Sequence, residues 1–186
     1  MKLIAIGDSI TYGFPYSPSA SWLDIAAQHC GLEYQNCGSN GETTGQMLRR
    51  FSRDVCRFQP SHVIIMGGTN DVFEALCMKE IVDHTVKMAV LAMENGIIPI
   101  LGLPIPCNEP AVERRLSEYR AAIRKYTQDQ FIDLIDFFAA MADTDCPGIK
   151  PGLHCDGVHP NEAGYKVMAA VAIDFIETRL MCIKPA

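Results

Sequence analysis

The chain has 186 residues, of which 48% are hydrophobic, and its formal net charge is −6. The apolar share is ample for one globular domain, which we expect to span residues 1–186. The negative charge, with basic residues dispersed along the chain, argues against nucleic acid or an anionic membrane surface as a partner.

The sequence indicates neither a membrane segment nor a disulfide framework. No stretch approaches the roughly 20 apolar residues that a spanning helix needs, and the start MKLIAIGDSI reaches a Gly-Asp turn without a small-residue cleavage site. Eight cysteines are scattered through the expected helices and strands without any Cys-x-x-Cys pair, which favours reduced thiols over a structural metal. We therefore expect a cytoplasmic protein without a membrane span.

In chain order, short apolar runs alternate with segments of helical periodicity. A strand is predicted over residues 2–6 and a helix over 20–30, then a strand over 33–37 and a helix over 43–58. The order continues with strands over 62–66, 97–103 and 131–135, each followed by a helix, over 73–95, 109–128 and 161–180 respectively.

This alternation predicts the α/β class, with a mostly parallel five-stranded sheet between two layers of helices. Pro99 is awkward for a central strand, because proline has no N–H to give to the ladder. In the helix over 43–58, we interpret the cluster of Arg49, Arg50 and Arg53 as a solvated helix face.

Two loops at the expected carboxyl ends of strands carry residues suited to nucleophilic catalysis. Ser9 follows the first strand in the run Gly7-Asp8-Ser9, and a hydroxyl is a weak nucleophile unless a base removes its proton. Asp156 and His159 precede the last helix, where the imidazole can supply that base and the carboxylate can fix its tautomer. The sequence therefore predicts a Ser-His-Asp triad.

Four sequence blocks, taken together, resemble the SGNH hydrolases, also called GDSL esterases or lipases. The blocks are residues 7–9, 36–41, 68–71 and 156–159, in the family's order and at similar spacing over almost the whole chain. The resemblance implies a three-layer α/β/α sandwich of flavodoxin-like type. It also implies an oxyanion hole made by the Ser9 amide, the Gly41 amide and the Asn70 side chain, with Gly38 as the other candidate glycine.

Two further carboxylates, Asp8 and Asp71, have the pattern of turn-fixing residues that bind nearby backbone N–H groups. We expect them to support Ser9 and Asn70. The loops over 14–19, 72–77 and 103–108 are expected to wall the site.

The predicted activity is hydrolysis of a small-molecule carboxylic ester through an acyl-enzyme, without metal or cofactor. Short loops favour a short acyl group, acetyl above all, on an acetylated sugar or a lipid-like molecule. A lysophospholipase or thioesterase of the same family, and a non-catalytic flavodoxin-like module that binds phosphate or flavin, are the alternatives. A weaker alternative is a metal held by His154, Cys155, Asp156 and His159.

Overall fold

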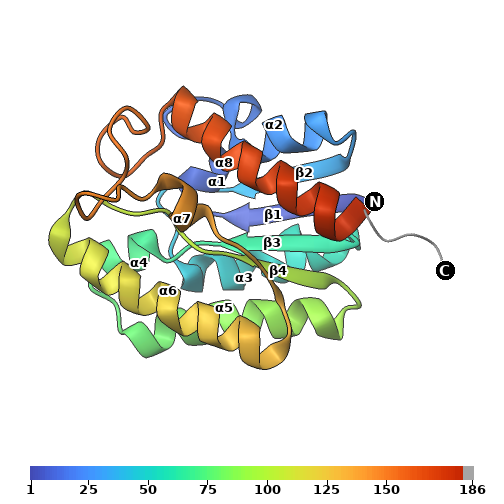
Figure 1. Ribbon diagram of the computed structural model, residues 1–186. Helices are drawn as coiled ribbons and strands as arrows, with labels where there is room; N and C mark the ends of the chain where they lie inside the picture. The colour runs from blue at the N-terminus through green and yellow to red at the C-terminus, as the bar shows by residue number, and fades with distance from the viewer. Residues whose placement is uncertain (182–186) are drawn as a thin grey trace.

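Five strands form one sheet in the order β2-β1-β3-β4-β5, and every neighbouring pair is parallel (Figure 1). The computed structural model describes residues 1–181. The strands are β1 (Lys2–Gly7), β2 (Glu33–Gly38), β3 (His62–Met66), β4 (Ile98–Gly102) and β5 (Asp133–Ile135). The predicted α/β class and five-stranded parallel sheet are confirmed.

Helices cover both faces of the sheet, which completes the three-layer arrangement (Figure 1). On one face α2 (Trp22–His29) and α7 (Phe137–Met141) pack against α8 (Glu162–Phe175), which continues into the π-helical segment η3 (Ile176–Met181). The other face carries α3 (Thr44–Asp54), α4 (Thr69–Phe73), α5 (Met78–Glu94) and α6 (Pro110–Gln130). Within residues 1–181, no helix combines the length and the apolar character that crossing a membrane requires.

Alternate side chains of each central strand enter two separate cores. In β1, Ile4 and Ile6 join the core beneath α3, α5 and α6, while Leu3 and Ala5 join the core beneath α2 and α8. All four side chains are at most 1% exposed. Burial on both faces explains why the strands read as continuous apolar runs rather than as alternating ones.

The largest departures from the predicted elements are short helices. The sequence pattern did not predict α1 (Ser9–Tyr12), α4 or α7, because one turn of helix contains too few residues to show periodicity. The helix expected over 73–95 begins at Met78, and the one expected over 43–58 ends at Asp54 and is followed by the 3-10 turn η2 (Cys56–Phe58). Another 3-10 turn, η1 (Pro18–Ala20), precedes α2.

Pro99 lies within β4 without removing a ladder hydrogen bond. The N–H of Ile98 points to β3, where it donates to the carbonyl of Ser61 at 3.1 Å. The neighbouring position along a strand points the opposite way, so Pro99 faces the β5 side. Pairing with β5 begins only at Ile100, opposite Asp133. The proline therefore occupies a position where no donor is needed.

Candidate active site

Ser9 is presented by a tight turn at the carboxyl end of β1. Asp8 is the N-cap of α1, and its side chain accepts a hydrogen bond from the Ile10 N–H at 2.9 Å. A Cβ atom at Gly7 would lie 2.5 Å from the backbone carbonyl oxygen of Met66 and 2.1 Å from Thr11 Oγ1, so only glycine fits before this turn. Ser9 is 7% exposed and is the first residue of α1, and the Asp8 cap fixes the direction of this helix.

The loop before α8 brings an imidazole to this hydroxyl. Nε2 of His159 lies 3.0 Å from Oγ of Ser9, although the two residues are 150 positions apart in the chain. Asn161 caps α8 by accepting a hydrogen bond from Gly164 N–H at 3.0 Å, and this cap fixes where the loop ends. The ring of Phe14 meets that of His159 edge-on, with 4.7 Å between the centroids.

Asp156 holds both the backbone and the ring of His159. One carboxylate oxygen, Oδ1, accepts from the N–H groups of Val158 at 2.9 Å and His159 at 2.8 Å. The other oxygen, Oδ2, lies 2.7 Å from Nδ1 of His159. Because a carboxylate can only accept, Nδ1 carries the ring proton, and the lone pair of Nε2 faces the Ser9 hydroxyl.

The electrostatics of the two carboxylates differ. Partial burial opposes ionisation of Asp156, but the three hydrogen bonds from Val158 and His159 outweigh it and lower its pKa to about 2. Complete burial raises the pKa of Asp8 to about 6, against the opposing effects of the Ile10 N–H and the nearby His159. Asp156 is therefore ionised throughout the neutral range, whereas Asp8 titrates just below it.

Two main-chain amides and one side-chain amide at this sheet edge have donor capacity to spare. Within residues 1–181, the N–H groups of Ser9 and Gly41 donate to no other residue. Asn70 uses one hydrogen of its Nδ2 on the carbonyl of Glu42 at 2.9 Å, which leaves the second hydrogen. By contrast, the Gly38 N–H is engaged by Oδ1 of Asn36 at 2.8 Å. Of the two candidate glycines, Gly41 has the available amide.

Asp71 has a different partner from the one expected. Its carboxylate accepts from the N–H of Thr44 at 2.9 Å and from the Thr44 hydroxyl at 2.5 Å, 27 residues away. The prediction that Asp71 binds a nearby backbone N–H was therefore wrong. Asp71 instead holds the start of α3, immediately after the loop that contains Gly41, and joins the third sequence block to the second.

His154 and Cys155 stabilise the loop before α8, which carries Asp156 and His159. Nδ1 of His154 lies 3.0 Å from the Gly157 N–H, which donates to it, and the Cys155 thiol approaches the carbonyl of Pro160. Asn108, after β4, was not singled out from the sequence. Its N–H donates to the Gly157 carbonyl at 2.8 Å, so the predicted wall over 103–108 contacts the loop that carries His159. Only the position of Asn108 after a strand could have indicated this role.

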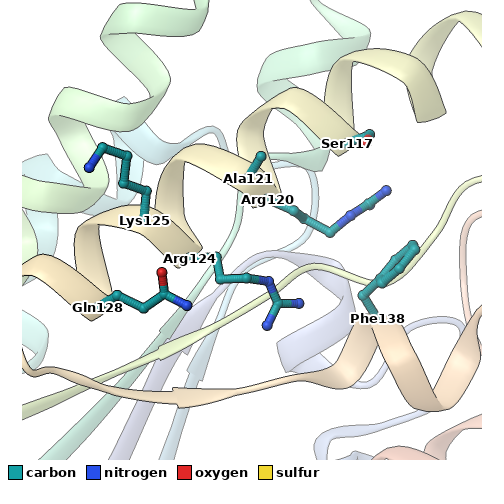
Figure 2. A pocket seen from close by; sticks show the side chains of 7 residues that line it. All are labelled: Ser117, Arg120, Ala121, Arg124, Lys125, Gln128 and Phe138. Atoms are coloured by element: carbon teal, nitrogen blue, oxygen red, sulfur yellow. The ribbon is translucent and has the colours of Figure 1, made fainter.

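A separate pocket of about 330 Å³ lies along α6 (Figure 2). Its cations already have carboxylate partners: Arg120 pairs with Glu113, and Arg124 pairs with Asp136 at 2.8 Å. The Arg120 guanidinium also lies over the ring of Phe138, 4.1 Å from its centroid. The residues that line this pocket include none of those predicted for catalysis.

Comparison with known proteins gives a consistent result. The model of the GDSL-like Lipase/Acylhydrolase family matches residues 5–167. An acetylxylan esterase of Geobacillus stearothermophilus is 26% identical, with 90% of each chain covered. The lipoprotein YqeF of Bacillus subtilis, which is uncharacterised, is 30% identical over 136 residues, and this chain spans only 56% of its length. The solved structure of a G-D-S-L family protein from Desulfitobacterium hafniense is 32% identical, with a TM-score of 0.87 and coverage of 93% of this chain and 98% of that one.

Proposed function

This chain belongs to the GDSL-like lipase/acylhydrolase family and is a carboxylic-ester hydrolase, and we propose that it acts as a serine esterase through Ser9, His159 and Asp156. The observation that carries the proposal is the continuous hydrogen-bonded series from the Ser9 hydroxyl to the His159 ring and on to the Asp156 carboxylate, with contacts of 3.0 and 2.7 Å. A series of this kind allows an imidazole to take up a hydroxyl proton while its own charge is compensated.

In the first half of the reaction, Oγ of Ser9 bonds to the ester carbonyl carbon as its proton passes to Nε2 of His159. The tetrahedral adduct then breaks its bond to the alcohol oxygen, which leaves with the proton from Nε2. In the second half, a water molecule gives its proton to Nε2 and attacks the acyl group. The carboxylic acid departs, and Ser9 regains its proton.

The negative oxygen of each tetrahedral adduct needs preorganised donors. We assign this role to the N–H groups of Ser9 and Gly41 and to the second Nδ2 hydrogen of Asn70, because these donors have no partner among residues 1–181. Removing one such donor typically lowers turnover by about 10²–10³. Asp8 and Asp71 support the donors by fixing the turn at Ser9 and the start of α3.

For the substrate we propose an ester with a short acyl group, acetyl above all. The segment after Asn70 is held in place by Arg115, whose guanidinium donates to the carbonyls of Val72 and Leu76. A wall fixed in this way has little freedom to open for a long chain. Phe14, a residue that is 38% exposed and whose ring lies beside His159, offers an apolar surface to a small group. The likeness to an acetylxylan esterase also supports acetyl.

The experiment compares wild type with Ser9→Ala on nitrophenyl acetate, with Ser117→Ala, at an exposed serine on α6, as the matched control. We expect a fluorophosphonate to label wild type and Ser117→Ala but not Ser9→Ala, and hydrolysis to vanish only in Ser9→Ala. Undiminished hydrolysis by Ser9→Ala ends the proposal.

A series of nitrophenyl esters of rising chain length, with acetylated xylan and a lysophospholipid beside it, tests the acyl group. We expect kcat/KM to be highest for acetate. A maximum at eight or more carbons, or on the lysophospholipid, replaces the acetyl proposal with a lysophospholipase or thioesterase.

A further inference from the structure

Arg50 is a largely buried cation close to the proposed site. Its side chain is only 10% exposed, whereas that of Arg53, one turn away on α3, is 70% exposed. The interpretation of the arginine cluster as a solvated face was therefore wrong for Arg50. A guanidinium withdrawn from water is costly unless its donors are paired, so its partners indicate what holds it there.

The guanidinium of Arg50 reaches three places at once. Nε lies 2.5 Å from a carboxylate oxygen of Glu42, and Nη1 lies 3.1 Å from one of Asp54 on the same helix. Nη2 donates to the main-chain carbonyl of Gly7 at 3.1 Å. Gly7 ends β1, directly before Asp8 and Ser9, so one arm of the fork holds the strand end that carries the nucleophile.

Glu42 extends this connection to the other two donors. It follows Gly41 directly in the chain, and its main-chain carbonyl accepts the hydrogen bond from Nδ2 of Asn70 at 2.9 Å. One planar group thus fixes the Gly7 carbonyl and the Glu42 side chain relative to each other. Ser9 follows Gly7 by two residues, and Gly41 directly precedes Glu42. The Asn70 side chain is hydrogen-bonded to the Glu42 carbonyl, so all three proposed oxyanion donors adjoin these two contacts.

We propose that Arg50 is a positioning residue that sets the spacing of the oxyanion donors, an inference that rests on the proposed esterase function. Donors stabilise a tetrahedral oxyanion only when they are already in place, and small displacements lower the rate steeply. A planar fork with several fixed N–H directions can hold two groups at a set separation. The single ammonium of lysine, on a flexible stem, cannot.

The test is Arg50→Lys, which keeps the charge and removes the fork. We expect kcat for nitrophenyl acetate to fall about 10- to 100-fold while KM changes less than about threefold, because the donors act on the transition state. The acid limb of the pH–kcat profile should stay where it is in wild type, because the contacts among Ser9, His159 and Asp156 are untouched. If Arg50 only stabilises the fold, Arg50→Lys should lower Tm without lowering kcat more than it changes KM.

Three further variants make the test specific. Arg53→Lys is the matched control on the exposed face and should keep wild-type kinetics. Asp54→Asn removes the carboxylate that Nη1 of Arg50 contacts on its own helix, away from the site. This variant should have a lower Tm and a kcat within about twofold of wild type. Glu42→Gln removes the negative charge that faces Nε of Arg50 and should lower kcat by about 3- to 30-fold. If Arg50→Lys does not fold, Glu42→Gln tests the proposal by itself. In the double variant Arg50→Lys/Glu42→Gln, the losses should be less than multiplicative, because both changes break one unit.

The results of these variants distinguish the positioning role of Arg50 from the esterase function itself. If Ser9→Ala is inactive but Arg50→Lys and Glu42→Gln have wild-type kcat, the positioning role falls and the esterase proposal stands. If Asp54→Asn loses as much kcat as Arg50→Lys, the effect belongs to helix stability, and the positioning role is again overturned. If Ser9→Ala retains wild-type activity, both proposals fall together.

Discussion

Replacing Asp156 by asparagine tests how His159 is held, because the two carboxylate oxygens have separate partners. Oδ1 binds two backbone N–H groups, and Oδ2 lies 2.7 Å from Nδ1 of His159. In Asp156→Asn, the amide oxygen can keep both backbone bonds, which places the NH₂ group against Nδ1. Two donors then face each other, and the ring relieves this by moving its proton to Nε2. Nε2 can no longer accept the Ser9 proton.

The loss expected from this inversion is large. A triad with the wrong tautomer typically turns over about 10⁴ times more slowly, or about 5.5 kcal/mol in the barrier. The Asp156 side chain is 49% exposed, and water can compensate part of the mismatch. We therefore expect kcat for nitrophenyl acetate to fall roughly 10³-fold, with Asp145→Asn on the preceding exposed loop as the control.

Comparison with Asp156→Ala makes the prediction sharper. Alanine loses both backbone hydrogen bonds, each worth about 1 kcal/mol, but it puts no donor against the ring. The order of Tm should therefore be wild type, asparagine, alanine, while alanine should be at least as active as asparagine. If the asparagine variant falls between wild type and alanine in activity as well as in Tm, or stays within tenfold of wild type, the tautomer argument is refuted.

Three other predictions concern single side chains. Asn70→Ala should lower kcat for nitrophenyl acetate by about 10²–10³ with little change in KM, and a higher KM at unchanged kcat would contradict its role as a transition-state donor. Burial raises the pKa of Asp8 from 3.8 to about 6, so the folded chain holds this proton more tightly than the unfolded one, and stability is lost as the pH rises from about 4 to 6. Asp8→Asn escapes that loss, so its free energy of unfolding relative to wild type, from urea titrations, should be roughly 2–3 kcal/mol higher at pH 8 than at pH 4; equal differences at both pH values would refute the assignment. Phe14→Ala removes the ring that packs on His159, and steady-state kinetics should show a two- to tenfold lower kcat/KM; an unchanged value would mean that this contact contributes nothing.

The fold could be predicted because its signals are local. The strand over 62–66 coincides with β3, and the other strands differ from prediction by one or two residues at their ends. Apolar runs and helical periodicity record burial, and burial on two faces is what a parallel sheet between helices imposes. The one-turn helices were missed because each is too short to show periodicity, and α4 also depends on a tertiary contact: Asp71 lies in it and binds Thr44 on α3. A contact across 27 residues leaves no periodic trace.

The same distinction separates the parts of the site. Ser9, Asp156 and His159 stand in compact motifs at the ends of the chain, so residue type and order were enough to propose them. Arg50 shows the opposite case. In sequence it is one of three similar arginines on a helix, and nothing local separates it from Arg53. Only the packing of α3 against the end of β1 withdraws it from water and aims its fork at the Gly7 carbonyl. Groups that react can therefore be read from short motifs, whereas groups that hold them apart at the right distance are defined by the tertiary structure.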